Sequence, residues 1–203
     1  MRALMEKLLT GAPLSCAEYA GLIEQWQDAD AGALFAAARA ACDGTYGKDV
    51  YLRGLIEVSN YCKNDCRYCG IRRSNTRAER YRLTPDEILD CCARGYARGL
   101  RTFVLQGGED AWFTCERVES LVRQIKARYP DCAVTLSLGE HPKESYAAWR
   151  RAGADRYLLR HETADAAHYA RLHPAPLTLE NRMRCLRQLR ELGYQVGAGF
   201  MVG

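Results

Sequence analysis

Three cysteines within eight residues, Cys62, Cys66 and Cys69, have the types and the spacing of a metal-ligating set. Thiolates bind zinc and iron–sulfur clusters, and both kinds of site normally take four protein ligands. No fourth Cys or His lies close in sequence to this C-x3-C-x2-C motif. Cys91 or Cys92 could supply a fourth ligand only if the tertiary fold placed it beside the three cysteines. An iron–sulfur cube held by three thiolates leaves one iron open. The spacing therefore favours a catalytic cluster that binds a further ligand.

Two alternatives remain open for these cysteines. One is a zinc site completed by a distant ligand, and the other is a chance grouping of structural cysteines in a chain that has ten. The other seven cysteines occur in helical or strand patterns and are expected to be small buried hydrophobic residues. The chain opens with an amphipathic helix and no signal peptide, so we expect a reducing cytoplasm and no disulfides.

The composition is that of an ordinary globular protein. The 203 residues include 29 Lys+Arg and 25 Asp+Glu, a net charge of +4 that we take to be spread along the chain. Such a mild excess suits small anionic ligands and does not indicate nucleic acid. The longest apolar runs, such as 33–38, are too short to span a bilayer. We therefore expect neither nucleic acid nor a membrane among the partners.

Strand-like and helix-like segments alternate after a helical stretch at the start of the chain. Ser15 with Glu18 predicts a capping box that opens one early helix, and Asp43-Gly44 is expected to end the next. Thr84 with Glu87 predicts a second capping box. Strands are predicted at 52–58, 102–105, 133–136, 156–159 and 194–203.

This alternation predicts an α/β fold with a parallel sheet, and it fits both a doubly wound sheet and a TIM-like (β/α) barrel. Polar residues that follow successive strands, as at 106–110 and 160–162, favour the barrel, whose sites lie at the carboxyl ends of its strands. We expect a helical extension at 1–49 and a partial barrel at 50–203 that is truncated after the fifth strand. It would belong to a longer protein or be completed by a partner.

The cysteine motif, with Tyr68 directly before the third cysteine, resembles that of the radical S-adenosylmethionine (SAM) enzymes. The resemblance implies a [4Fe-4S] cluster whose open iron binds SAM and cleaves it reductively to a 5′-deoxyadenosyl radical. It also implies that Gly107-Gly108-Glu109 contacts the SAM amino group, Arg182 its carboxylate and Met201 its adenine. The candidate cofactor contacts are Tyr68, Gln106, Gly107, Gly108, Glu109, Ser137, Glu162, Arg182 and Met201.

Two of these contacts also have an ordinary interpretation. Arg182 is one of four arginines between positions 182 and 190, and a lone arginine on such a helix is usually solvated. Glu162 lies in a segment that follows a strand, where a single glutamate is again usually solvated. The resemblance is what favours a binding role for Arg182, and a position at a strand end, where barrel sites occur, favours one for Glu162.

The wider resemblance is to the [FeFe]-hydrogenase maturases, in the biotin synthase-like class. The segments LRGLIEVSNYCKNDCRYCGIRR, VLQGGED and LGYQVGAGFMVG carry it, with one departure, because Gly107 stands where that family commonly has Ser. It implies assembly of the di-iron centre of the hydrogenase H-cluster, a small or organometallic iron substrate, a ferredoxin or flavodoxin as electron donor, and other maturases as partners. Methylornithine synthase or biotin synthase remains the alternative, although biotin synthases tend to follow the third cysteine with Pro-Gln.

The resemblance also suggests contacts for the substrate. Arg156 and Arg160, four residues apart on one predicted strand, are expected to face inward and attract an anion. A salt bridge to a neighbouring helix is the equal alternative. Thr135 and Ser137 share one strand face and are either cavity hydroxyls or ordinary inward polar residues.

Overall fold

The computed structural model describes residues 2–26 and 28–202, and the chain divides into two compact units, 1–51 and 52–203. The first unit contains the helices α1 (Arg2–Leu9), α2 (Cys16–Glu24) and α3 (Asp28–Tyr46). Met5, Leu14 and Leu22 form a small core of their own, and Lys7 Nζ lies 2.7 Å from Glu18 Oε1. No helix in the described part of the chain is long and apolar enough to cross a membrane.

The N-terminal helices confirm one prediction and correct another. Ser15 and Glu18 form the expected capping box at the start of α2. Helix α3 does not end at Asp43-Gly44 but continues to Tyr46. A glycine inside a helix costs only about 1 kcal/mol, so Gly44 is tolerated, and the left-handed Gly47 (φ 63°) follows the end of the helix instead.

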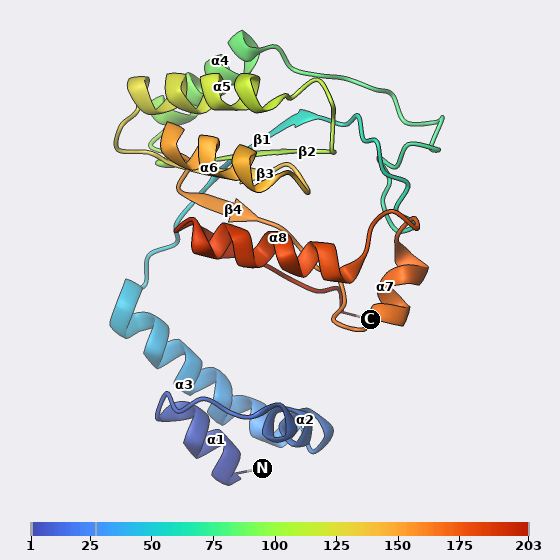
Figure 1. The fold of residues 1–203 in the computed structure, drawn as a ribbon. Coiled ribbons are helices and arrows are strands. Elements are labelled where there is room, and N and C mark those ends of the chain that lie inside the picture. Colours follow the sequence, from blue (N-terminus) through green and yellow to red (C-terminus); the bar gives the residue numbers. More distant parts are fainter. Residues whose placement is uncertain (1, 27, 203) are drawn as a thin grey trace. The chain divides into compact units, whose positions relative to one another are not determined.

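The second unit is built on a five-stranded parallel sheet with the order β1-β2-β3-β4-β5. A doubly wound sheet reverses its strand order at a switch point, whereas this order is sequential throughout. The predicted partial (β/α) barrel is therefore confirmed (Figure 1). The strands are β1 (Gly54–Ser59), β2 (Thr102–Gly107), β3 (Ala133–Ser137), β4 (Arg156–Leu158) and β5 (Gln195–Gly197).

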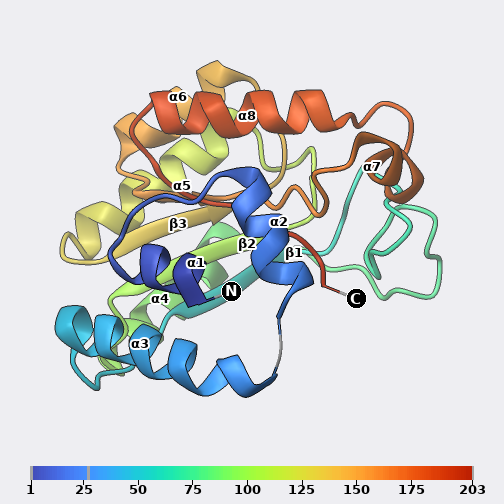
Figure 2. The same ribbon diagram turned by 90° about the horizontal axis from the view of Figure 1, so that it is seen from below.

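Helices follow the strands and cover one face of the sheet (Figures 1 and 2). They are α4 (Pro85–Ala97), α5 (Cys115–Arg128), α6 (Lys143–Ala152) and α8 (Leu179–Glu191), and the short α7 (Ala166–Leu172) lies off the sheet (Figure 1). The capping box of Thr84 and Glu87 opens α4 as expected. The fifth strand is shorter than the predicted 194–203, since glycines at 197 and 199 weaken a strand.

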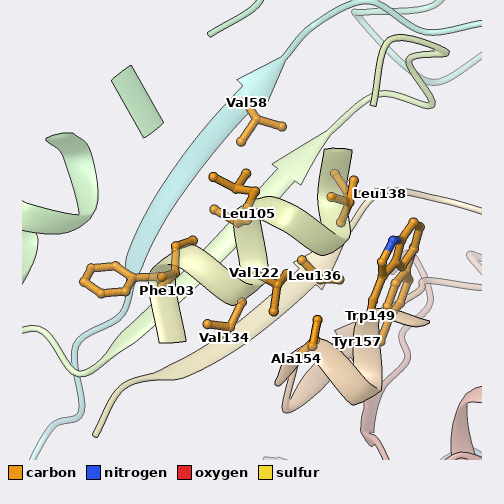
Figure 3. Close-up of a cluster of buried hydrophobic side chains, with 14 of the residues drawn as sticks. Val58, Phe103, Leu105, Val122, Val134, Leu136, Leu138, Trp149, Ala154 and Tyr157 are labelled. Atoms are coloured by element: carbon orange, nitrogen blue, oxygen red, sulfur yellow. The ribbon is translucent and has the colours of Figure 1, made fainter. Parts of the chain in front are cut away.

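Alternate residues of the strands point into the helix-covered core. Phe103 and Leu105 of β2, Val134 and Leu136 of β3 and Tyr157 of β4 are almost completely buried there (Figure 3). Because side chains alternate along a strand, the intervening residues face the other side, called here the inner face. The parallel register places residues of neighbouring strands side by side on that face, as in the layers of a barrel interior.

Arg160 lies beyond the strand on which it was expected. Strand β4 ends at Leu158, so Arg156 and Arg160 do not lie on one strand. Arg156 is half-buried on the inner face, where its Nε donates to Gln195 Oε1 at 2.6 Å. The Arg160 side chain is exposed, and neither arginine forms an ion pair among the described residues. Only Arg156 therefore lies within β4, and an inward-facing Arg160 stays a prediction.

Candidate functional site

The three cysteines lie on a loop that leaves the sheet after β1 and returns to the same place. An antiparallel bridge joins Ser59 to Arg82, and the backbone N–H of Leu83 donates to Val58 O at 2.9 Å. Arg82 Nε and Nη2 donate to the two oxygens of Asp110 at 2.7 and 2.9 Å. Residues 60–82 thus form a closed loop, called here the cysteine loop. Its two ends lie side by side, and Arg82 at one end is hydrogen-bonded to Asp110, which follows β2.

One side chain holds the interior of the cysteine loop together. The guanidinium of Arg80 donates to Ile71 O at 2.8 Å, to Arg72 O at 2.7 Å, to Asn75 O at 3.2 Å and also to Asn60 O. A charged donor shared among several carbonyls replaces the regular hydrogen bonds that a loop lacks. Nothing in the local sequence pattern distinguished this arginine from its neighbours.

Cys62, Cys66 and Cys69 are half-buried on this loop. Burial raises the pKa of Cys62, and burial together with Cys62 and Cys69 raises the pKa of Cys66 to about 11. In the absence of a bound metal, the neutral thiol forms of Cys62 and Cys66 are therefore favoured. Such thiols release their protons when they bind a metal ion. In the described chain, no three Cys, His, Asp or Glu side chains converge on a single metal ion. Three ligands of a cube bind three different irons, so convergence on one point is not required.

The two downstream cysteines do not return to the site. Cys92 is fully buried in the helix-side core of α4, and Cys91 packs against the same core. Cys132 and Cys185 are also buried there, which confirms their interpretation as small hydrophobic residues, whereas Cys16 and Cys42 are exposed and do not fit it. The sequence possibility that Cys91 or Cys92 completes a zinc site is thus wrong for this fold.

The glycines after β2 bring that strand against the cysteine loop. A Cβ on Gly108 would lie 2.2 Å from Tyr61 O and 2.8 Å from the Cβ of Cys62, so only glycine fits. Gly107 is less crowded, with Ser59 O at 3.0 Å. The next residue, Glu109, is thereby held close to the first cysteine, and its carboxylate contributes to the raised pKa of Cys62 after burial.

Glu109 is a buried carboxylate with spare capacity to accept hydrogen bonds. Its Oε1 accepts the backbone N–H of Glu140 at 3.0 Å, and its side chain fills the space over Gly139 (φ 85°). Lys63 Nζ lies 3.1 Å from Oε2, yet that oxygen makes no well-aligned hydrogen bond with a described residue. Lys63 is largely exposed, so it neutralises the charge of Glu109 without satisfying this oxygen.

Arg182 is buried, which overturns the alternative of a solvated arginine. Its Nε donates to Glu140 Oε1 and its Nη1 donates to Arg160 O, both at 2.5 Å. Asn181 Nδ2 donates to the other oxygen of Glu140 at 2.5 Å. Burial and the Glu140 partnership act on the arginine in opposite directions, and the net result is a raised pKa. Arg182 joins the ends of β3 and β4 to the first turn of α8.

Glu162 and Met201 lie together beyond β4 and β5. Glu162 is buried with φ 64°, a left-handed conformation that is uncommon for a residue with a side chain and often marks a functional site. Its carbonyl accepts the backbone N–H of Met201 at 2.9 Å, and its own N–H donates to Gly199 O at 3.0 Å. The Met201 side chain is about half-exposed.

Helix α7 supports the cysteine loop from the side. The backbone N–H of Arg67 donates to Leu172 O at 2.9 Å. His173 Nδ1 donates to Tyr169 O at 3.0 Å, so the neutral ring accepts the Tyr68 hydroxyl at Nε2, 3.1 Å away. Burial lowers the pKa of His173 and favours that neutral form. Tyr169 stacks on His173, and its buried hydroxyl has no partner among the described residues.

Gln106, Ser137 and Thr135 lie on the inner face below these loops. Gln106 pairs in register with Ser137 of β3, and its Nε2 donates to Glu57 Oε1 at 3.3 Å. Thr135 pairs with Arg156 of β4. The inner face is therefore polar near the carboxyl ends of the strands.

The predicted residues thus meet at one edge of the sheet, and sequence reasoning missed several that join them. Glu140 was missed although a glutamate after a Gly at the end of the third strand was a usable signal. Lys63, Arg80, Tyr169 and His173 had no such signal, because their contacts connect segments far apart in the chain. The arrangement offers thiols, a buried carboxylate and a buried arginine around a polar face, which is a donor set suited to an iron–sulfur cluster and a zwitterionic ligand.

Comparisons with known proteins agree with this geometry. The family model of the radical SAM superfamily matches residues 56–203. The chain is 48% identical over 157 residues to the [FeFe] hydrogenase maturase subunit HydE of Thermotoga maritima, covering 77% of this chain and 44% of that protein. It is 28% identical over 200 residues to the 3-methylornithine synthase of Methanosarcina acetivorans, covering 98% and 56%. The chain spans about half the length of the curated relatives it matches.

Solved structures share the fold over nearly the whole chain. The crystal structure of methylornithine synthase (PylB) gives a TM-score of 0.86 at 28% identity, covering 98% of this chain and 59% of that one. A crystal structure of HydG, described as a maturase of the [FeFe]-hydrogenase, gives 0.87 at 24% identity, covering 99% and 46%. At that identity, the second likeness concerns the fold alone.

Proposed function

From the premise that this chain belongs to the radical SAM superfamily, we propose that it holds a [4Fe-4S] cluster on Cys62, Cys66 and Cys69 and acts on SAM. When bound, the cluster and SAM supply one-electron cleavage of a carbon–sulfur bond and a carbon radical. The observation that carries the proposal is the closed cysteine loop, which has three half-buried thiols and the buried Glu109 beside them.

The chain's own residues orient the cofactor and keep water from it. Glu109 Oε2, a buried acceptor without a well-aligned partner, is proposed to accept the amino group of SAM. Arg182 is proposed to face its carboxylate while Glu140 and Arg160 O hold the guanidinium in place. Glu162 and Met201 are proposed to border the nucleoside. Tyr68, fixed by His173, is proposed to shield the cluster.

The substrate of the whole protein is proposed from its relatives and the inner face. The 48% identity to HydE supports a role in maturing an [FeFe]-hydrogenase, through an organometallic iron substrate and with an electron-donor protein. Thr135 and Arg156 are proposed to contact that substrate, since they adjoin in register on the inner face. A methylornithine synthase activity is the second candidate, because that match extends over 98% of the chain, including its N-terminal helices.

The test begins with anaerobic reconstitution using iron and sulfide, followed by electron paramagnetic resonance of the reduced protein with and without SAM. We expect a cubane signal that SAM shifts. Cys66→Ser should lose the cluster and Cys16→Ser, a change at an exposed cysteine, should keep it. Glu109→Gln should keep the cluster and lose the shift. Tightly bound zinc with no cubane signal would instead support a non-catalytic metal-binding module.

A second measurement separates the two activities. The protein is assayed for restoring active hydrogenase in an extract that lacks HydE, and for producing 3-methylornithine. We expect restoration in the first assay, with Arg156→Ala sparing SAM cleavage but losing maturation. Formation of 3-methylornithine without restoration would favour the second candidate.

A further inference from the structure

The positive charge of this protein is concentrated in the cysteine loop. Residues 60–82 contain seven Lys or Arg and two Asp or Glu, a net of +5, whereas the whole chain carries +4. The other 180 residues therefore carry a net of −1. This distribution corrects the expectation that the charge is spread along the chain. A strong local excess of one sign attracts partners of the opposite sign.

The fold uses only some of these cations. Arg80 and Arg82 hold the loop and its base, and Lys63 neutralises Glu109. Arg67 and Arg73 are exposed, and their guanidinium groups form no hydrogen bond or ion pair with any described residue. Stability of the loop accounts for the first group, because its members satisfy buried carbonyls and carboxylates. It does not account for Arg67 and Arg73.

Arg67 and Arg73 share one surface next to the cysteines. Both border a cavity of about 710 Å³ that is otherwise lined mainly by α7 and the segment that follows it, together with the acidic residues Asp65 and Glu180. Arg67 directly follows Cys66, and the backbone N–H of Arg73 donates to Asn64 O at 2.9 Å. Both cations are therefore carried on the loop that positions the thiols.

We propose that Arg67 and Arg73 form the docking surface for an acidic protein that carries single electrons. The inference rests on the proposed function, which requires reduction of the cluster by one electron. In this step the carrier is oxidised by one electron and the cluster is reduced by one, with no bond made or broken and no proton transferred. Electron-transfer partners use small interfaces, and rim charges act mainly on their rate of encounter.

The charge argument favours a protein carrier over nucleic acid. Binding along a nucleic-acid backbone takes a groove or stripe of cations with stacking side chains, whereas this patch is confined to one loop beside a short cavity. An acidic carrier needs only local charge complementarity close to the redox centre. The half-buried cysteines lie on the same loop, which places the cluster ligands near that surface.

The test compares two charge-reversed variants of the reconstituted protein, with a purified acidic flavodoxin as the probe. Arg67→Glu/Arg73→Glu removes the patch. Arg53→Glu/Arg187→Glu makes the same change in net charge at two exposed arginines, before β1 and on α8, that lack side-chain partners among the described residues. Stopped-flow absorbance follows cluster reduction by the reduced flavodoxin and, separately, by dithionite. Flavodoxin binding is measured by calorimetry at low and high salt.

We expect the patch variant to slow reduction by flavodoxin about tenfold or more and to flatten its salt dependence, while the control pair stays within about twofold. Reduction by dithionite should be equal in all three proteins, since it needs no docking. Equal flavodoxin rates in the two variants would overturn the proposal. So would tighter binding of a single-stranded oligonucleotide than of flavodoxin that is lost with Arg67→Glu/Arg73→Glu. Failure to form any cluster would contradict the proposed function instead, and flavodoxin binding would still test the surface.

Discussion

The helix-side core and the cysteine loop are held by different forces. The core buries Trp149, Tyr157 and Phe103 almost completely, and apolar packing joins the sheet to its helices. None of residues 60–82 is buried to that degree, and the loop is held by hydrogen bonds such as those of Arg80. Packing depends on volume and tolerates small shifts, whereas hydrogen bonds depend on direction. Substitutions in the core should therefore lower the stability of the whole protein. Substitutions in the loop should reduce metal binding before they reduce global stability.

The largest expected effect comes from the core. Trp149→Ala removes a fully buried indole whose Nε1 donates to Cys115 O at 3.0 Å, so it leaves a cavity and loses this hydrogen bond. We expect the free energy of unfolding to fall by about 3–5 kcal/mol, measured by urea denaturation. Met183→Ala, at a partly exposed position of α8, should cost much less. A loss at Trp149 as small as that at Met183 would contradict the assigned core.

A change where core and loop meet should have an intermediate effect. A Cβ on Gly108 collides with the backbone of Tyr61, so Gly108→Ala must push the loop away from β2. We expect a loss of about 1–3 kcal/mol in stability together with a marked loss of bound iron after reconstitution. Gly70→Ala, in the same loop but with open space around it, is the control and should load normally. Full loading of the Gly108 variant would show that this contact does not position the thiols.

Within the loop, Arg80→Met should separate local order from global stability. It leaves the carbonyls of Ile71 and Arg72 without their donor, which typically costs about 1–3 kcal/mol for a partly buried site. We expect faster amide exchange in residues 60–82 and less bound iron, with the exchange of the core strands unchanged. Arg77→Met, at an exposed arginine, should alter neither. If amide exchange in the core strands of the Arg80 variant rose as much as in the loop, the loop and the core would not be held independently.

The smallest effect concerns a thiol in the core. Burial raises the pKa of Cys92 to about 12, from an ordinary value near 9. The folded state thus retains this proton where the unfolded state loses it, so stability is present below about pH 9 and declines as pH rises toward 12. The decline is at most about 1.4 kcal/mol per pH unit. Unfolding of Cys92→Ala should show a shallower fall between pH 9 and 10 than the unaltered protein. Identical slopes would indicate that the thiol is not buried in solution.

The elements of the second unit were largely predictable from the sequence. Period-two apolar segments such as 102–105 and 133–136, and capping residues such as Thr84, carry their signals within a few neighbouring positions. Boundaries were less predictable where the local pattern was weak, as at Gly44 in α3 and at the end of β5. In α3 the surrounding helix outweighs the preference of a single glycine, whereas in β5 two closely spaced glycines shorten the strand.

The sequence alone determined the cysteine spacing, the order of strands and helices and the family to which they point, because these depend on residues that are close in the chain. Only the tertiary structure decided that Arg182 is buried on Glu140, that Arg80 binds the carbonyls of its own loop and that Glu162 is buried in a left-handed conformation. Each of these outcomes depends on which distant groups come within hydrogen-bond distance. A charged side chain carries no local signal of its partner, so its role is settled only when the chain is folded.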